Sequence, residues 1–201
     1  VPFSVGDLLY FILIIGSIRW FWLQRKSWKN RWKTNTLVVL SFFSVLYFAF
    51  HLLWGLNYYR EPLFEKMKIE REYSDAALLV FTKTLIAKTN AVQLQITQNK
   101  NAKIVLPYSQ EQVFQMNVEG YKTLSGDYPF FEYSALSVKK SIFSLPLTYM
   151  GFGGYLNPFT NEAQVNYLMP MYHSPTTSCH EMAHQMGYAS ESECNFIGFM
   201  A

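Results

Sequence analysis

The segment Thr177–Gly187 reads Thr-Ser-Cys-His-Glu-Met-Ala-His-Gln-Met-Gly and contains the pattern His-Glu-x-x-His. On a helix, residues four apart lie one turn above each other on the same face, so His180 and His184 can both reach one metal ion. Glu181 lies beside them, where it can accept a proton from a water on that metal. We therefore predict that a helix from about Thr176 to Met186 carries a Zn²⁺ site. An ordinary amphipathic helix is the alternative, but the motif is restrictive.

A catalytic zinc site needs a third protein ligand and leaves one position open for water. In the metzincin pattern that ligand is a third histidine, and Ser190 occupies its place here. In gluzincins it is a glutamate on a following helix, often with an acid or amide four residues later that supports a ligating histidine. Glu191 and Asn195 have this spacing. The segment from Glu191 to Asn195, Glu-Ser-Glu-Cys-Asn, resembles the Glu-x-x-Ala-Asp element of membrane-linked gluzincins, with Cys for Ala and Asn for Asp.

Glu193 competes with Glu191 for the same role. Ser190 and Glu193 have the spacing of a capping box, which would occupy Glu193 at the helix start and leave Glu191 for the metal. We therefore predict His180, His184 and Glu191 as the zinc ligands. His173, or a ligand beyond residue 201, stays open as an alternative.

Two apolar runs lie near the start of a chain of 201 residues that is 50% hydrophobic and only 15% charged. Val5–Leu23 is interrupted only by Asp7 and Arg19, and Thr36–Tyr58 contains no Asp, Glu, Lys or Arg. Each run is long enough to cross a bilayer as a helix, which takes about 20 residues. The alternatives are two buried helices of a soluble core or, for the first run, a signal peptide, which a basic segment would normally precede. We predict two membrane spans.

The loop at 24–35 between these runs has five basic residues and no acidic one: Arg25, Lys26, Lys29, Arg31 and Lys33. Cytoplasmic loops carry such an excess, so this loop is expected in the cytoplasm and residues 59–201 outside it. Trp54, Tyr58 and Tyr59 lie where the second span should leave the bilayer, as interfacial aromatic residues do. Topology explains the basic cluster, so we expect no nucleic-acid partner.

Two further helices are predicted after the spans. Ser74 caps the first, which runs to about Gln98, and Ser109 with Gln112 forms a capping box that opens the second, to about Ser125. The first helix carries an apolar stripe at heptad spacing that we expect to pack in the core: Leu78, Leu85 and Val92.

The segment at 147–175 is punctuated by glycine and proline. We expect a turn at Asn157–Pro158 and an extended strand near Ala163–Leu168. A strand just before a zinc helix can lie along the cleft and pair with an extended peptide, in which case Asn166 or Tyr167 would face the substrate. An ordinary hairpin or loop is an equal alternative.

Of the two cysteines, Cys179 lies just before the motif and Cys194 shortly after it. Outside the cytoplasm they could form a disulfide between neighbouring helices. Two buried thiols beside a metal site are an equally good interpretation, and Cys194 as a zinc ligand is a third.

Four stretches of the chain resemble a family of bacterial membrane proteins catalogued as domain of unknown function 3810: Trp54–Arg60, Gly154–Ala163, His180–Gly187 and Glu193–Phe196. Cys194 stands where alanine would be expected. The resemblance implies N-terminal spans and a zincin-like domain, and it brings no established substrate.

Together these observations predict a mainly α (α+β) protein. Residues 1–58 would form a two-span anchor in a bacterial inner membrane, and 59–201 an extracytoplasmic zincin-like domain with a small β element before the active-site helix. The ends look cut, so we expect the sequence to be a fragment that lacks a C-terminal part, with further spans open in the full chain. Polar residues flank the motif, which places it outside the lipid.

The predicted function is a membrane-anchored zinc metallopeptidase of the gluzincin kind, acting on a peptide or protein substrate. Glu181 would be the general base. The oxyanion could be stabilised by any of four residues: Tyr155, Tyr167, Tyr172 and His173. One alternative is a non-catalytic, zinc-stabilised envelope assembly or sensor protein, in which Glu181 is dispensable. Another is an amidase acting on peptidoglycan peptides, with the same metal chemistry.

Overall fold

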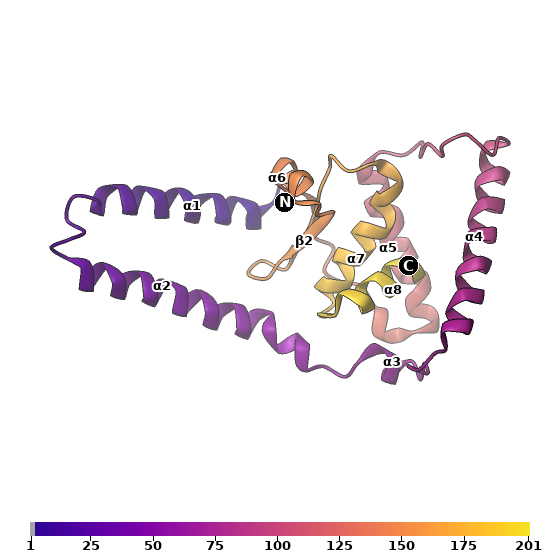
Figure 1. Ribbon diagram of the computed structural model, residues 1–201, viewed down its shortest axis with the longest axis horizontal. Helices are drawn as coiled ribbons and strands as arrows, with labels where there is room; N and C mark the ends of the chain where they lie inside the picture. Colours follow the sequence, from indigo (N-terminus) through magenta and orange to yellow (C-terminus); the bar gives the residue numbers. More distant parts are fainter. Residues whose placement is uncertain (1–2) are drawn as a thin grey trace. The chain divides into compact units, whose positions relative to one another are not determined.

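The computed structural model describes residues 3–201. It is mostly helical with one small three-stranded sheet, as expected (Figure 1). The chain divides into two units, one formed by the residues up to Arg60 together with Gln110–Ala201, and the other by Glu61–Ser109. The boundary expected at residue 58 stays a prediction.

The first unit begins with two long apolar helices, α1 (Val5–Gln24) and α2 (Trp32–Leu53). Both are long and apolar enough to cross a membrane, and only 11% of the most apolar window of α1 and 0% of that of α2 is buried. Among the described residues, apolar side chains this exposed argue against the alternative of two core helices. The prediction of two apolar N-terminal helices is confirmed.

The rest of the first unit is a helical layer on a small sheet. Its elements are the 3₁₀ helices η1 (Gly55–Tyr59), η2 (Pro129–Phe131) and η3 (Met171–His173), the helices α5 (Gln110–Asp127), α6 (Ser144–Met150), α7 (Ser174–Gln185) and α8 (Glu191–Met200), and the strands β1 (Val138–Lys140), β2 (Gly154–Asn157) and β3 (Glu162–Val165). Helix α7 packs against the sheet, α5 and α8. The core between them contains large buried side chains: Val113, Tyr121, Phe131, Val165, Met182 and Ile197.

The strand order is β1-β3-β2, with β3 parallel to β1 and antiparallel to β2. The predicted turn at Asn157–Pro158 is confirmed, because the Asn157 side chain accepts hydrogen bonds from the backbone of Phe159 (3.0 Å) and Thr160 (3.2 Å) and closes the β2–β3 hairpin. The strand expected near Ala163–Leu168 forms as β3 and belongs to a hairpin, which was the equal alternative, whereas its expected position along the cleft is wrong. Strand β3 is central, with a partner on each side, so it has no edge to offer a peptide.

The second unit contains α3 (Leu63–Lys66) and α4 (Asp75–Thr97). Ser74 caps α4 as predicted, accepting a hydrogen bond from the backbone of Ala77 at 3.2 Å. The expected core packing of its stripe is wrong, because no residue of α4 is buried. Its three stripe residues are 46%, 39% and 51% exposed: Leu78, Leu85 and Val92. Heptad spacing fixes a common face, but it does not provide a partner for that face.

Candidate metal centre

The motif helix α7 forms where the sequence places it, starting two residues earlier than expected. Pro175 lies in the first turn, where its missing N–H costs no hydrogen bond. Gly187 ends the helix in the left-handed conformation (φ 88°), which favours glycine, and its N–H donates to the His184 carbonyl at 2.8 Å. Met182 and Ala183 are fully buried on the core side, so the packing of α7 determines that His180 and His184 face the cleft.

Glu191, the first residue of α8, lies against both histidines. Its carboxylate oxygens are 3.1 Å from His180 Nε2 and 3.5 Å from His184 Nε2. All three potential ligand atoms lie within 4.8 Å of one another. In a tetrahedral site with bonds of about 2.0–2.1 Å, neighbouring ligand atoms are about 3.3 Å apart. The two distances to Glu191 are close to this value, and the three side chains together could hold a metal ion.

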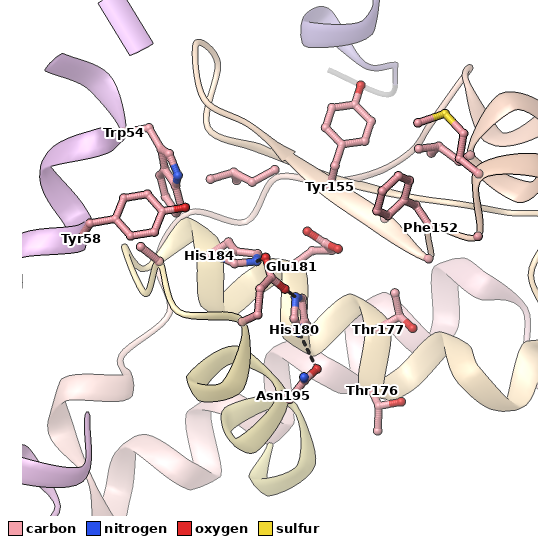
Figure 2. Close-up of a pocket in the computed structure, with 18 residues that line it drawn as sticks. Trp54, Tyr58, Phe152, Tyr155, Thr176, Thr177, His180, Glu181, His184 and Asn195 are labelled. Carbon is pink, nitrogen blue, oxygen red and sulfur yellow. Dashed lines mark hydrogen bonds and ion pairs between the residues drawn. The ribbon is translucent and has the colours of Figure 1, made fainter. Parts of the chain in front are cut away.

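Each histidine ring is oriented through its other nitrogen. His180 Nδ1 is 3.0 Å from Asn195 Oδ1 (Figure 2). His184 Nδ1 is 2.7 Å from the Tyr188 carbonyl. Because both partners are acceptors, Nδ1 donates in each case, which leaves each Nε2, on the side facing Glu191, to bind a metal ion. Burial lowers the pKa of His184, which favours the neutral imidazole that a metal ion needs.

Glu181 lies beside this cluster, almost completely buried (4% exposed). Its Oε2 has no hydrogen-bond partner among the described residues, and burial, together with the charge of Glu191, raises its pKa to about 8. A buried carboxylate oxygen without a partner is rare in folded proteins, and a polar ligand or water in the cleft would satisfy it. Gly154 makes room for this side chain, because a Cβ there would lie 2.8 Å from Glu181 Oε1 and 2.5 Å from the Gln164 carbonyl.

These groups line a cleft of about 690 Å³. Strand β2 forms one wall, with Gly154 and Leu156 among its lining residues. The Asn166 N–H donates to the Gly153 carbonyl at 2.8 Å, so in this register the N–H and C=O groups of Gly154 and Leu156 point away from β3. Strand β2 is one of the two edge strands. It therefore lies along the cleft, where β3 was expected.

Asn166 and Tyr167, expected to face a substrate, do not line this cleft. Asn166 is buried, and its amide donates to Thr148 Oγ1 (2.9 Å) and to the Phe152 carbonyl (3.1 Å). This side chain therefore fixes the loop that precedes β2.

Residues 1–201 match the model of a family described as Protein of unknown function (DUF3810). The chain belongs to this family. The resemblance carried by the four sequence stretches is thereby confirmed, and the family description assigns no activity to the cleft. Neither a search of curated proteins nor one of solved structures found a match.

Within this DUF3810 chain, the structure distinguishes among the candidate third ligands. The cluster contains Glu191, whereas Glu193 and His173 lie outside it. The half of the predicted capping box that depends on the Ser190 hydroxyl does not form. Ser190 has the backbone conformation of an N-cap, but its hydroxyl bonds to Ser192 Oγ (2.9 Å) and makes no capping hydrogen bond. The packing of α8 against α7 places Glu191 in the cluster.

Of the four residues predicted as candidates to stabilise the oxyanion, only Tyr155 lies at the cleft. Tyr155 lines the cleft, but its hydroxyl donates to the Asp7 carboxylate and points away from Glu181 (Figure 2). The other three candidates do not line the cleft: Tyr167, Tyr172 and His173. Trp54 and Tyr58 do line it. Sequence reasoning assigned these two residues only to the membrane interface, and no local signal in the sequence connects them with the motif.

Both cysteines are free and buried, so the disulfide alternative is wrong. Cys194 Sγ is 3.3 Å from His184 Nδ1 and 3.2 Å from the Tyr188 carbonyl. It therefore lies on the opposite side of the imidazole from Nε2, away from the position an ion would occupy between the histidines and Glu191. The structure therefore supports the second interpretation, in which both cysteines are buried thiols beside the site.

Proposed function

We propose that this protein is a membrane-anchored, zinc-dependent metallopeptidase with a zincin-like domain of the gluzincin kind, acting at the extracytoplasmic face of a bacterial inner membrane. One observation carries the proposal. Three potential ligand atoms, from His180, His184 and Glu191, converge within 4.8 Å beside the unpartnered buried carboxylate of Glu181. A structural zinc site is usually closed by four protein ligands, whereas three ligands and a neighbouring base are typical of a hydrolytic site.

The chemistry follows from the positions of these side chains. His180, His184 and Glu191 would hold the zinc ion, which would supply the Lewis acidity that activates a water for attack on a carbonyl. Glu181 accepts a proton from the attacking water at Oε2 as the new C–O bond forms. It then donates that proton to the amide nitrogen as the C–N bond breaks, which releases an acid and an amine. Burial around Glu181 excludes competing solvent from this proton transfer.

The open edge of β2 supports a peptide as the substrate. An extended chain could pair with the outward N–H and C=O groups of Gly154 and Leu156, and this would place its backbone beside Glu181. Backbone pairing favours an extended polypeptide regardless of its side chains. Selection among substrate side chains would then depend on the other residues that line the cleft.

The two apolar helices support the membrane anchor. Their side chains are exposed along both helices, and the loop between them is basic, which favours a cytoplasmic position for that loop. The cleft lies at the opposite ends of the helices from this loop, beside Trp54, and is then extracytoplasmic.

The test combines elemental analysis with peptide hydrolysis on the purified chain. We expect about one zinc per wild-type chain, loss of zinc in His180→Ala, and retained zinc without hydrolysis in Glu181→Gln. Glu193→Gln changes a glutamate of α8 outside the cluster, and it should retain both zinc and activity. Hydrolysis by Glu181→Gln at the wild-type rate would reject the catalytic role and favour a zinc-stabilised assembly or sensor protein. A full zinc content in His180→Ala would reject the site itself.

A further inference from the structure

The first apolar helix begins inside the folded domain. Asp7, in the first turn of α1, is completely buried. Its carboxylate accepts hydrogen bonds from Ser141 Oγ (3.0 Å), the Ile142 N–H (2.7 Å) and the Tyr155 hydroxyl. A buried carboxylate with three donors is strongly fixed, because losing one partner leaves a desolvated charge. The start of α1 is thus attached to the wall of the cleft.

A second carboxylate strengthens this attachment. Glu162, at the start of β3, accepts from the N–H groups of Val5 (3.2 Å) and Gly6 (2.6 Å), which lack partners within the helix. A negative charge at this position also interacts favourably with the helix dipole. The Gln164 amide donates to the Ser4 hydroxyl at 2.7 Å. Strand β3 therefore holds α1 in a fixed position relative to the cleft.

The second apolar helix ends at the opposite wall. The Trp54 ring, immediately after α2, contacts the His184 ring edge-on with centroids 5.7 Å apart. Arg60 donates to the Met186 carbonyl at 2.7 Å and lies over the Tyr188 ring. The chain that leaves α2 therefore packs on the end of the motif helix, and it places Trp54 directly beside a proposed metal ligand.

These attachments fix the height of the cleft above the membrane. From Leu8 to Gln24, α1 is about 26 Å long, and the 22 residues of α2 are about 33 Å long, so both lengths are close to a hydrocarbon core of about 30 Å. If α1 and α2 cross the bilayer as proposed, none of their length remains to raise the domain above the surface. Tyr155 and Trp54 line the cleft at the two helix ends, so the cleft opens at the level where the helices emerge.

We infer that the substrate is a polypeptide itself tethered in the membrane, cleaved in its extracytoplasmic segment within about ten residues of the bilayer. This inference rests on the proposed peptidase function. An extended chain advances about 3.3 Å per residue, and each headgroup layer is about 5–8 Å thick. The first residues that emerge from a tether therefore reach the cleft directly. A peptide bond further from the tether reaches the cleft only when the chain folds back toward the membrane surface. Its effective concentration at the cleft therefore falls as the spacer lengthens.

The test reconstitutes the zinc-loaded full chain in vesicles with two tethered substrates. Both carry the same library of randomised ten-residue peptides on the same transmembrane anchor, after a Gly-Ser spacer of either 5 or 40 residues. Equal membrane density removes any advantage from co-localisation alone. The same library without an anchor is the third substrate, and mass spectrometry of released fragments gives the rates.

We expect the 5-residue form to be cleaved about tenfold faster than the 40-residue form, and the free peptides more slowly than either. Tyr58→Ala, which changes the wall at the end of α2, should slow cleavage of the short form. Tyr59→Ala is the matched control, because Tyr59 is 87% exposed and outside the cleft lining, and its rate should equal that of the wild type. Equal rates for the two spacers would overturn this inference and leave the peptidase proposal standing. Cleavage of none of the three substrates would overturn both.

Discussion

Replacing Asn195 by alanine should weaken zinc binding without removing any ligand. The Asn195 amide oxygen is the acceptor for His180 Nδ1, at 3.0 Å. Without it the imidazole can rotate, and water must replace the acceptor, so the ring loses its fixed orientation toward Glu191. Partners of this kind in metal sites contribute about 10–100-fold in metal affinity.

The position of Asn195 determines where in that range the effect falls. The hydrogen bond is exposed, so solvent can replace much of what the amide provides. We therefore expect a loss near the lower limit, about tenfold in the dissociation constant, or about 1.4 kcal/mol. The corresponding partner of His184 is a backbone carbonyl at 2.7 Å in a buried position, which no side-chain substitution removes.

The assay is competition for zinc between the protein and a chelating dye, with thermal unfolding of the zinc-free form as the measure of folding. Asn195→Asp keeps an acceptor at the same place and adds negative charge, so its affinity should equal or exceed that of the wild type. Ser192→Ala changes another exposed side chain of α8, and it should have no effect. An unchanged zinc affinity in Asn195→Ala would refute the assignment of His180 Nε2 as a ligand atom oriented by Asn195.

The remaining predictions concern the cleft, the thiols and the attachment of α1. Gly154→Ala should reduce the rate of hydrolysis about tenfold to 100-fold by displacing the proposed base while zinc is retained, whereas Gly126→Ala, where a Cβ meets nothing within 4 Å, should be neutral in a peptidase assay. Cys179 and Cys194 should react with maleimide only after denaturation, without prior reduction; labelling that requires a reductant would indicate a disulfide. Asp7→Ala should lower the free energy of unfolding by about 3 kcal/mol, since it removes the acceptor of one buried donor, Ser141 Oγ, and of two part-buried donors, the Ile142 N–H and the Tyr155 hydroxyl, and chemical denaturation in detergent would measure this.

Much of the local structure follows from the sequence. The spacing of His180 and His184 fixes their common face, because a helix turns once in about 3.6 residues wherever it forms. The lengths of the apolar runs likewise predict α1 and α2, and Ser74 predicts the start of α4, since capping depends only on adjacent residues.

Contacts between segments far apart in the sequence could not be predicted from these local rules. The sequence suggested a strand at Ala163–Leu168, but its role depends on pairing with Val138–Lys140 on one side and Gly154–Asn157 on the other. That pairing makes β3 central and β2 the edge along the cleft. Periodicity could not predict this order, because the alternation of side chains in a strand does not specify which neighbours it has.

The sequence by itself determined which residues can act together on one helix: the two histidines and the glutamate of the motif, at spacings set by backbone geometry. Only the tertiary structure decided what surrounds them. It brought Glu191 to the histidines through the packing of α8, engaged the Tyr155 hydroxyl with Asp7 from 148 residues away, and placed Trp54 beside His184. Such contacts depend on how buried surfaces fit across the whole fold, and the spacing of residues along the chain carries no record of that fit.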